Sequence, residues 1–270
     1  MAPRIPRHPP PPPAAPLFAE GEGWALYHGD ALAVLPSLKG VNGVITDPPY
    51  SSGGAMRGDR TASPNAKYLR SDSKQADYIP TFAGDNRDQR SYLAWSALWL
   101  GMCLDLAQPG AVLCCFTDWR QLPVTTDAVQ AGGWVWRGVL PWLKPNPRPV
   151  AGRFAGGAEY VVWGSAGPMR DEGPCLPGHF TANADRGREH VTQKPLELMR
   201  IVVELVDVGG MVLDPFAGSG TTGVAALLSG RRFVGIERCL EHCEVAARRL
   251  AEASGDFRPS TTPQLHLGVA

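Results

Sequence analysis

Short apolar runs alternate with stretches of helical periodicity along most of the chain. Apolar runs bounded by turn residues predict buried strands, and apolar positions three or four apart predict helices. The predicted strands are 24–28, 41–46, 111–117, 134–143, 158–163 and 232–236, and a further strand opens the run 211–223. The predicted helices are 30–38, 91–106, 122–130, 195–206 and 240–252, and another begins after the glycines near residue 220. This alternation indicates an α/β domain.

Irregular segments interrupt the pattern at both ends and at two places inside it. Residues 1–18 include five consecutive prolines and predict a disordered tail, and 255–270 a loose C-terminal tail. Residues 51–90 are polar and aperiodic, which in a compact domain favours a functional loop. Residues 164–189 are rich in glycine and proline. We therefore expect one domain over 19–254, with 51–90 facing a partner and 164–189 as a short recognition insert.

Composition narrows the classes of protein. The 270 residues are 44% hydrophobic with a formal net charge of zero, which permits a large core and requires any nucleic-acid surface to be local. We find no apolar run long enough for a membrane span and no secretory signal, and we expect a cytoplasmic protein. The six cysteines show no paired C-x2-C spacing, so we expect no metal. Cys239, His242 and Cys243 could approach one another on a helix, but packing explains them better.

A candidate chemical motif follows the apolar run 41–46. It consists of Asp47, Pro48, Pro49 and Tyr50. Because proline cannot donate to a sheet ladder, the strand ends at Asp47 and leaves a carboxylate at the strand's carboxyl end. A carboxylate and proline-flanked carbonyls beside an aromatic ring suit a planar group that carries an NH2, such as adenine or cytosine. The alternative is an ordinary Pro-Pro turn in which Asp47 caps or forms the turn.

The run 211–223 predicts a strand, a glycine turn and a helix start. Gly218, Gly220 and Gly223 satisfy G-x-G-x-x-G, and Glu237 follows near the spacing of a ribose-binding acid. Alone, this pattern fits a dinucleotide site, a methionine-nucleoside site or a simple glycine turn. No hydride-acceptor constellation accompanies it, whereas the Asp47 turn needs an alkyl donor. S-adenosylmethionine fits both halves.

Basic residues gather in two places that could face phosphates. The loop 51–90 mixes them with aromatic residues, and 132–158 holds four basic residues and no acidic one. An ordinary solvated loop is the alternative for 51–90, because aspartates dilute its charge. The expected DNA-contacting residues are Arg57, Arg60, Lys67, Arg70, Lys144, Arg148 and Arg153 from these two stretches and Arg186 from the insert 164–189.

Three motifs together resemble one family. Asp47-Pro-Pro-Tyr50, Phe216-Ala-Gly-Ser-Gly220 and Thr192-Gln-Lys-Pro195 resemble the amino-group DNA methyltransferases. The catalytic motif precedes the glycine motif, which is similar to the circularly permuted β group and to orphan or prophage-encoded enzymes. The resemblance implies a Rossmann-like, S-adenosylmethionine-dependent methyltransferase fold with permuted motif order and a mostly parallel central sheet.

The resemblance also implies roles for individual residues. Asp47, Pro48, Pro49 and Tyr50 would form the catalytic turn, which holds and stacks on a flipped-out base. The implied cofactor-binding residues are Asp30, Asp47, Lys194, Asp214, Phe216, Gly218, Ser219, Gly220, Thr221 and Glu237. The implied partners are double-stranded DNA and a second copy of the chain, in the cytoplasm near the nucleoid of a prokaryote or phage.

Adenine N6 is the expected target, because a carboxylate at position 47 stabilises positive charge on the amine more strongly than a hydroxyl does. Cytosine N4 is the main alternative. A protein-glutamine or RNA amino-methyltransferase, a dinucleotide-binding oxidoreductase and a non-catalytic DNA-binding protein also remain. The permuted motif order counts against the first of these.

Overall fold

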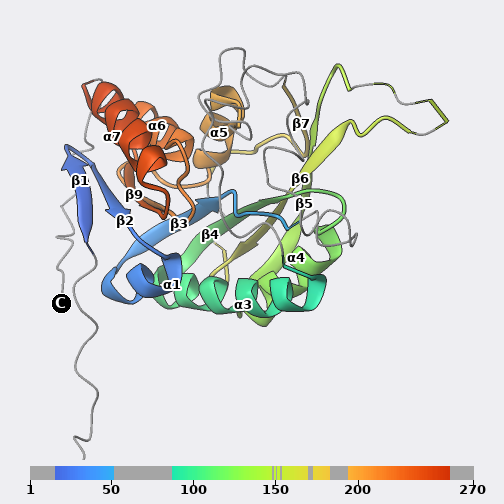
Figure 1. Cartoon of the computed structure of the whole chain (residues 1–270), viewed down its shortest axis with the longest axis horizontal. Helices are drawn as coiled ribbons and strands as arrows, with labels where there is room; N and C mark the ends of the chain where they lie inside the picture. The colour runs from blue at the N-terminus through green and yellow to red at the C-terminus, as the bar shows by residue number, and fades with distance from the viewer. Residues whose placement is uncertain are drawn as a thin grey trace, which may run out of the picture.

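The computed structural model describes residues 16–51, 87–147, 149, 151–152, 154–169, 173–182 and 194–255. Within them a nine-stranded sheet forms the centre of the molecule, in the order β1-β2-β9-β8-β3-β4-β6-β5-β7 (Figure 1). The strands are β1 (Leu17–Gly21), β2 (Trp24–His28), β3 (Val41–Thr46), β4 (Ala107–Thr117), β5 (Val135–Leu143), β6 (Ala158–Ser165), β7 (Phe180–Thr181), β8 (Met211–Asp214) and β9 (Arg232–Glu237). The helices are α1 (Ala31–Val34), the 3-10 helix η1 (Leu35–Ser37), α3 (Gln89–Leu106), α4 (Leu122–Ala131), α5 (Leu196–Val203), α6 (Thr221–Leu228) and α7 (Leu240–Ser254).

The sheet is mixed, which corrects the expectation of a mostly parallel one. Strands β2, β9, β8, β3 and β4 run parallel to one another, and β7 runs parallel to β5. Strand β1 is antiparallel to β2, and β6 is antiparallel to both β4 and β5. Antiparallel neighbours can be joined by a short hairpin, whereas parallel ones need a crossover. The chain forms one antiparallel pair, β1 with β2, on one side of the parallel strands. It forms another, β5 with β6, on the other side, next to β4.

Several boundaries differ from the predicted ones. Strand β1 includes Leu17 and Phe18, which the sequence had assigned to the tail, because an exposed edge strand has little hydrophobic signal. Strand β4 begins at Ala107 and runs through Pro109-Gly110, where a turn was predicted, and the register with β3 is irregular there. The predicted helix 30–38 is split into α1 and η1, and Pro36 lies in the 3-10 part.

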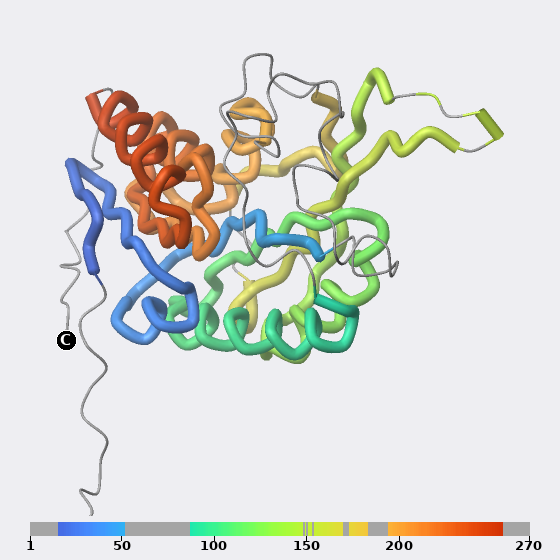
Figure 2. Tube along the Cα trace, viewed as in Figure 1, coloured from blue at the N-terminus to red at the C-terminus, as the bar shows by residue number. Residues whose placement is uncertain are grey.

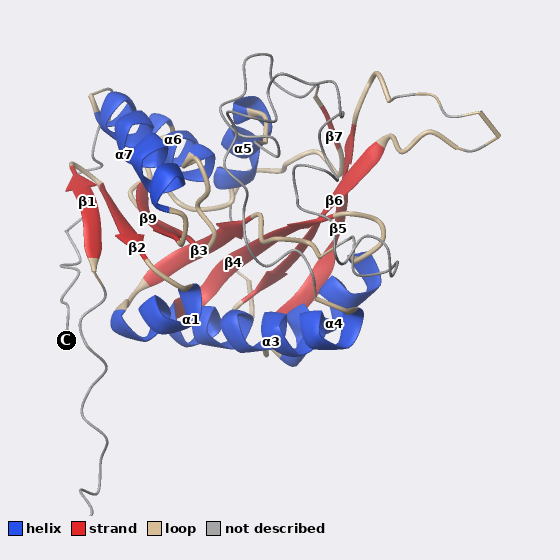
Figure 3. Ribbon diagram, viewed as in Figure 1, coloured by secondary structure: helices blue, strands red, loops and turns tan. Residues whose placement is uncertain are grey.

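Helices cover both faces of the sheet (Figure 3). One hydrophobic cluster joins α1, α3 and α4 to one face, and a second joins α5, α6 and α7 to the other. Side chains alternate along each strand, so Val44 belongs to the first cluster and its neighbour Ile45 to the second. This burial on both faces explains why the central strands read as continuous apolar runs in the sequence.

The parallel centre brings several strand ends to one edge. Strand β3 lies between β8 and β4, as the blue segment in the middle of Figure 2 shows. The carboxyl ends of β3, β8 and β9 lead directly into Asp47, the turn after Asp214 and Glu237. Open α/β sheets bind their ligands along this edge.

All six cysteines are free thiols, and Cys114 and Cys115 are buried in β4. Among the described residues, no helix combines the length and apolar character needed to cross a bilayer. The same residues contain no group of three or more His, Cys, Asp or Glu side chains arranged to hold a metal ion.

Candidate active site

The turn after β3 is held at both of its ends. The Tyr50 hydroxyl donates a hydrogen bond of 2.6 Å to Asp47 Oδ1. Ser51, which closes the turn, is buried and has a positive φ of 53°, a conformation that costs a non-glycine residue energy. Gln121 Nε2 donates to the Ser51 carbonyl at 3.1 Å, and the Arg87 N–H donates to Ser51 Oγ at 3.3 Å. These contacts hold the strained turn and fix the Asp47 carboxylate at the sheet edge.

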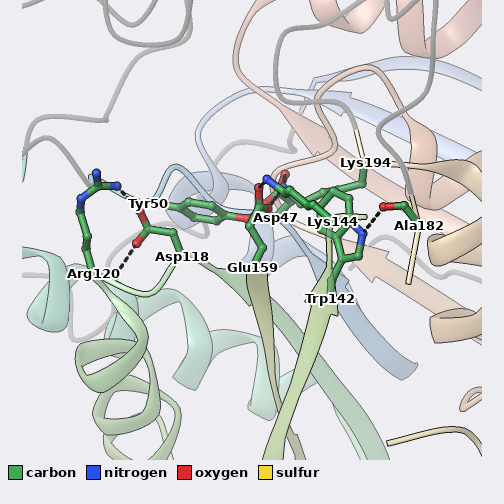
Figure 4. A network of polar contacts seen from close by, with 9 residues as sticks. All are labelled: Asp47, Tyr50, Asp118, Arg120, Trp142, Lys144, Glu159, Ala182 and Lys194. Carbon is green, nitrogen blue, oxygen red and sulfur yellow. Dashed lines mark hydrogen bonds and ion pairs between the residues drawn. The ribbon is translucent and has the colours of Figure 1, made fainter. Parts of the chain in front are cut away.

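Asp47 belongs to a network of two carboxylates and two ammonium groups (Figure 4). The Lys194 ammonium, which precedes α5, lies 2.7 Å from Asp47 Oδ2 and 3.3 Å from Glu159 Oε2. Lys144, at the end of β5, pairs with Glu159 Oε1 and lies 5.0 Å from the centre of the Trp142 ring. The Lys194 ammonium also faces the Tyr50 and Phe116 rings, at 5.1 and 5.4 Å. The four charges therefore balance one another within one partly buried cluster.

Burial and charge shift the pKa values of this cluster in different directions. Burial raises the pKa of Asp47, although Lys194 and Tyr50 counteract it. Burial and the neighbouring carboxylates raise the pKa of Tyr50 well above its ordinary value, so its hydroxyl stays a donor. Burial opposes the charges of Lys194 and Glu159. The Asp47 and Glu159 carboxylates outweigh it at Lys194 and raise the pKa of Lys194, and the Lys194 and Lys144 ammonium groups outweigh it at Glu159 and lower the pKa of Glu159. Lys194 is thus a cation and Glu159 an anion at neutral pH.

The second motif forms a turn organised by a buried carboxylate. Asp214 accepts hydrogen bonds from the Thr46 hydroxyl at 2.7 Å, the Thr222 hydroxyl at 2.6 Å and the Phe216 N–H at 3.0 Å. Burial raises the pKa of Asp214 to about 6, against these hydrogen bonds. Because Thr46 precedes Asp47, Asp214 ties the two motifs together across adjacent strands.

Two glycines of this turn allow backbone conformations with positive φ and leave room that a side chain would fill. Gly218 and Gly220 have φ values of 51° and 79°, which favour glycine. A Cβ at Gly220 would lie 3.1 Å from the Ala246 Cβ of α7, so the turn packs tightly there. A Cβ at Gly218 would meet nothing within 4 Å, so this glycine borders open space.

Glu237 closes the site on the far side of the glycine turn. Its Oε2 accepts from the Gly218 N–H at 2.9 Å, and its Oε1 accepts from the Cys239 N–H at 2.7 Å. Burial opposes its charge, but hydrogen bonds from His242 and from these backbone groups outweigh it and lower the pKa of Glu237. Asp30 lies nearby, because the Gly29 N–H donates to the Glu237 carbonyl at 2.9 Å. The Asp30 carboxylate itself caps α1 by accepting from the Leu32 N–H at 3.0 Å.

Aromatic side chains from α3 pack against the same turn. The Phe216 ring lies 5.3 Å from Trp95 and 5.1 Å from Trp99, measured between ring centres. The Arg87 guanidinium lies 4.1 Å from the centre of the Trp95 ring. Phe216 is thereby fixed between the glycine turn and α3.

The structure brings together most of the predicted site residues. Asp47, Tyr50 and Lys194 are in direct contact, and Asp214, Phe216, Gly218 and Glu237 surround the neighbouring turn. Lys144, predicted to contact DNA, is already paired with Glu159, with 34% of its side chain exposed. The other seven predicted DNA-contacting residues lie outside the described part of the chain: Arg57, Arg60, Lys67, Arg70, Arg148, Arg153 and Arg186.

Three further residues were not predicted from the sequence. Glu159 joins Lys144 and Lys194, and Trp95 supports Phe216. Arg249 of α7 donates to the Ser219 carbonyl at 2.6 Å, to Ser219 Oγ at 3.0 Å and to Thr221 Oγ1 at 3.1 Å. A charged residue inside an apolar strand was a signal for Glu159, since charges are rarely buried without a partner. Trp95 and Arg249 lie on ordinary amphipathic helices and carry no such signal.

Comparisons with known proteins agree with this geometry. A family model described as DNA methylase matches residues 168–248, which include Lys194 and the glycine turn. The Type II methyltransferase M2.DpnII of Streptococcus pneumoniae is 25% identical over 250 residues, covering 83% of this chain and 88% of that protein.

Two solved structures share the fold. The M1.HpyAVI–SAM complex is 24% identical with a TM-score of 0.60, covering 84% of this chain and 98% of that one. The cytosine-N4-specific PvuII DNA methyltransferase is 15% identical with a TM-score of 0.64, covering 86% of this chain and 92% of that one. The family model and the curated relative thus make this chain similar to DNA methyltransferases, and the two solved structures share its fold.

Proposed function

We propose that the chain is a site-specific DNA methyltransferase that moves a methyl group from S-adenosylmethionine to N6 of a flipped-out adenine in duplex DNA. The observation that carries this proposal is the Asp47 carboxylate at the end of β3, bound by Tyr50 and joined through Thr46 to the glycine turn. A hydrogen-bond acceptor for an amine thus lies one strand away from a turn suited to a nucleoside. The order of the two turns along the chain supports the permuted β-group subtype.

The residues of the glycine turn fit S-adenosylmethionine. Gly218 borders open space, so a nucleoside can approach its backbone without meeting a side chain. Glu237 stands beside it, and its oxygens retain lone pairs that can accept from ribose hydroxyls. Phe216, Ser219, Gly220 and Thr221 would line the remainder, Asp30 would lie near the adenine, and Lys194 near the carboxylate. Asp214 acts on the cofactor through the turn that it organises.

The chain's own residues position and activate the target amine. When bound, S-adenosylmethionine supplies a sulfonium methyl group, which the amine nitrogen takes as the carbon–sulfur bonding pair leaves on sulfur. Asp47 and the Pro48 carbonyl accept the two amine hydrogens, which localises the nitrogen lone pair and favours attack. Pro49 shapes the turn, and Tyr50 stacks on the base. Asp47 then accepts the proton that the methylated nitrogen releases, which its raised pKa favours. Positioning supplies most of the acceleration.

The test is the identity of the methylated atom. We would incubate the protein with labelled S-adenosylmethionine and duplex DNA, digest the DNA to nucleosides and identify the methylated one. We expect N6-methyladenine, and sequencing of methylated bases would give the recognition sequence. N4-methylcytosine without N6-methyladenine would overturn the assignment.

Cytosine N4 is the second candidate. The fold of a cytosine-N4-specific enzyme matches this chain with a TM-score of 0.64, so the architecture accommodates either base. We favour adenine because position 47 is a carboxylate and stabilises positive charge on the amine more strongly than a hydroxyl.

The proposal extends to DNA contacts and assembly. We expect Arg57, Arg60 and Arg70 to contact phosphates, so neutralising all three should flatten the salt dependence of DNA binding. An unchanged logarithmic salt slope would contradict this role.

We also expect a two-fold homodimer on DNA, because the insert 164–189 is short. We expect this complex to act in the cytoplasm near the nucleoid. A monomeric mass for the active complex would contradict the dimer.

A further inference from the structure

Both oxygens of the Asp47 carboxylate already accept hydrogen bonds from the protein. Tyr50 donates to Oδ1 at 2.6 Å, and the Lys194 ammonium donates to Oδ2 at 2.7 Å. An amine that approaches Asp47 therefore meets a fixed positive charge on the same oxygen. During methyl transfer the amine itself becomes positive, so an ammonium left in that place would oppose the reaction.

We infer that Glu159 is a positioning residue for methyl transfer: it is the second carboxylate onto which Lys194 shifts when the target amine takes over Asp47 Oδ2. This inference rests on the proposed function, because it assigns Asp47 to the amine. It adds a residue that lies 112 positions away from Asp47 in the sequence and outside every motif.

Apart from the carboxylate of S-adenosylmethionine, which the proposed function places near it, Lys194 has no other easy destination among the described groups. Its side chain is only 7% exposed, so it does not reach bulk water by a small movement. The two carboxylates raise its pKa, so it does not escape by losing its proton. The Tyr50 and Phe116 ring centres lie 5.1 and 5.4 Å from its ammonium nitrogen. These two rings limit where the ammonium can move.

Glu159 offers an acceptor at the required distance. Its Oε2 lies 3.3 Å from the Lys194 ammonium. Within the described part of the chain this oxygen is buried and accepts no hydrogen bond of good geometry. A buried acceptor without a donor is costly, so a short shift of Lys194 toward Glu159 gains a hydrogen bond there as it releases one at Asp47.

Lys144 keeps Glu159 ready for this exchange. It pairs with the other oxygen, Oε1, and thereby fixes the direction of Oε2. Glu159 is also held by its place on β6, opposite Trp142 of β5. The titratable groups that interact with Glu159 are Lys144, Lys194 and, less strongly, Asp47 and Tyr50. The arrangement therefore has one movable cation, Lys194, between two carboxylates.

A double-mutant cycle on Glu159 and Lys194 tests the inference. We would measure single-turnover methyl transfer to bulk DNA from a methylation-free strain, with wild type, Glu159→Gln, Lys194→Met and the double variant. We expect Glu159→Gln to lower the rate at least about tenfold, because Lys194 then has no second carboxylate of the protein to accept it and stays on Asp47. In the Lys194→Met background the same change should cost less than about twofold, since Glu159 acts through Lys194.

Further readouts separate positioning from folding. Glu159→Gln should keep the affinity for S-adenosylmethionine within about threefold and should retain the wild-type circular dichroism spectrum. Glu159→Asp keeps the charge and should regain at least about threefold of the lost rate. It also serves as the test variant if the glutamine form does not fold, with a reduced rate and unchanged cofactor affinity expected. The matched control is Glu197→Gln, which removes an exposed carboxylate close to Lys194 in the sequence and should change the rate less than about twofold.

Two results would overturn the inference: a Glu159→Gln rate within twofold of wild type, or equal losses from that change in both backgrounds. Failure of the proposed function is a different result, because wild type itself would then transfer no methyl group to DNA.

Discussion

The two turns at the sheet edge are built in contrasting ways. Most polar partners of the glycine turn come from nearby in the sequence: Thr222, Glu237 and Arg249 lie 8, 19 and 30 residues from the groups they bind, and Thr46, 168 residues from Asp214, is the distant one. The Asp47 turn draws Gln121 and Lys194 from 70 and 147 residues away. The first turn is thus one compact strand–turn–helix unit with its own supports. The second is a short strained turn whose carboxylate is paired with Lys194, which lies far away in the sequence, just before α5.

This contrast indicates where each turn is vulnerable. Changes in the glycine turn should act on cofactor affinity and on stability, because its polar groups are bound to one another. Changes in the Asp47 turn should act on the rate of methyl transfer, because its carboxylate is the group that remains partly exposed, at 23% of its side-chain surface.

Replacing Asp47 by alanine should give the largest effect. We expect methyl transfer to fall at least about a thousandfold, or about 4 kcal/mol in the barrier, because the amine loses its charged acceptor. The measurement is transfer of labelled methyl groups to DNA, with thermal unfolding as the check on the fold. Asp47→Asn, which keeps the shape without the charge, should fall between alanine and wild type. Activity of the alanine variant within about tenfold of wild type would remove Asp47 from the catalytic role.

Asp214 should give the next largest effect, on stability and with a defined pH dependence. Its folded pKa is about 6, above its ordinary value of 3.8, so the folded state holds this proton more tightly than the unfolded state. The resulting stabilisation is present below about pH 4 and is lost as the pH rises through 6, roughly 3 kcal/mol in total. Asp214→Asn should therefore destabilise the protein less at pH 7 than at pH 4.

Urea unfolding at the two pH values measures this difference. Asp105→Asn, which changes an exposed carboxylate on α3, is the matched control. An equal loss of stability from Asp214→Asn at both pH values would contradict the role of burial.

The same contrast explains what the sequence predicted. The strands that lead into Asp47 and Glu237 were predicted within a residue, and the strand before the glycine turn was predicted without bounds, because buried parallel strands are continuous apolar runs ended by proline, glycine or charge. The glycine turn was predicted because its interactions are local. The ion pair of Glu159 with Lys194 was not predicted from the sequence. It depends on the antiparallel pairing of β6 with β4 and β5, which places Glu159 near Asp47. The expected parallel sheet was wrong at those same strands.

Replacing Glu237 by alanine tests whether changes in the glycine turn act on cofactor affinity. We expect S-adenosylmethionine to bind about 30-fold more weakly, roughly 2 kcal/mol, because a charged acceptor for the ribose is lost together with the bond to the Gly218 N–H. Calorimetric titration measures this affinity, and Glu237→Gln should show a smaller loss. Glu244→Ala, an exposed glutamate on α7, is the matched control. Unchanged affinity in Glu237→Ala would exclude Glu237 from the cofactor site.

Arg249→Met should give the smallest of these effects, and again on affinity rather than rate. The guanidinium holds the Ser219 carbonyl and the Ser219 and Thr221 hydroxyls, so its loss should loosen the loop that we propose faces the cofactor. Gly220 still packs against Ala246 of α7, so the turn keeps part of its support. We therefore expect about fivefold weaker S-adenosylmethionine binding, about 1 kcal/mol, with the single-turnover rate at saturating cofactor unchanged. Arg248→Met, the exposed neighbour, is the matched control, and Arg249→Lys should recover part of the affinity. A loss of rate at saturating cofactor would instead mean that the glycine turn and the Asp47 turn move as one unit through Asp214 and Thr46.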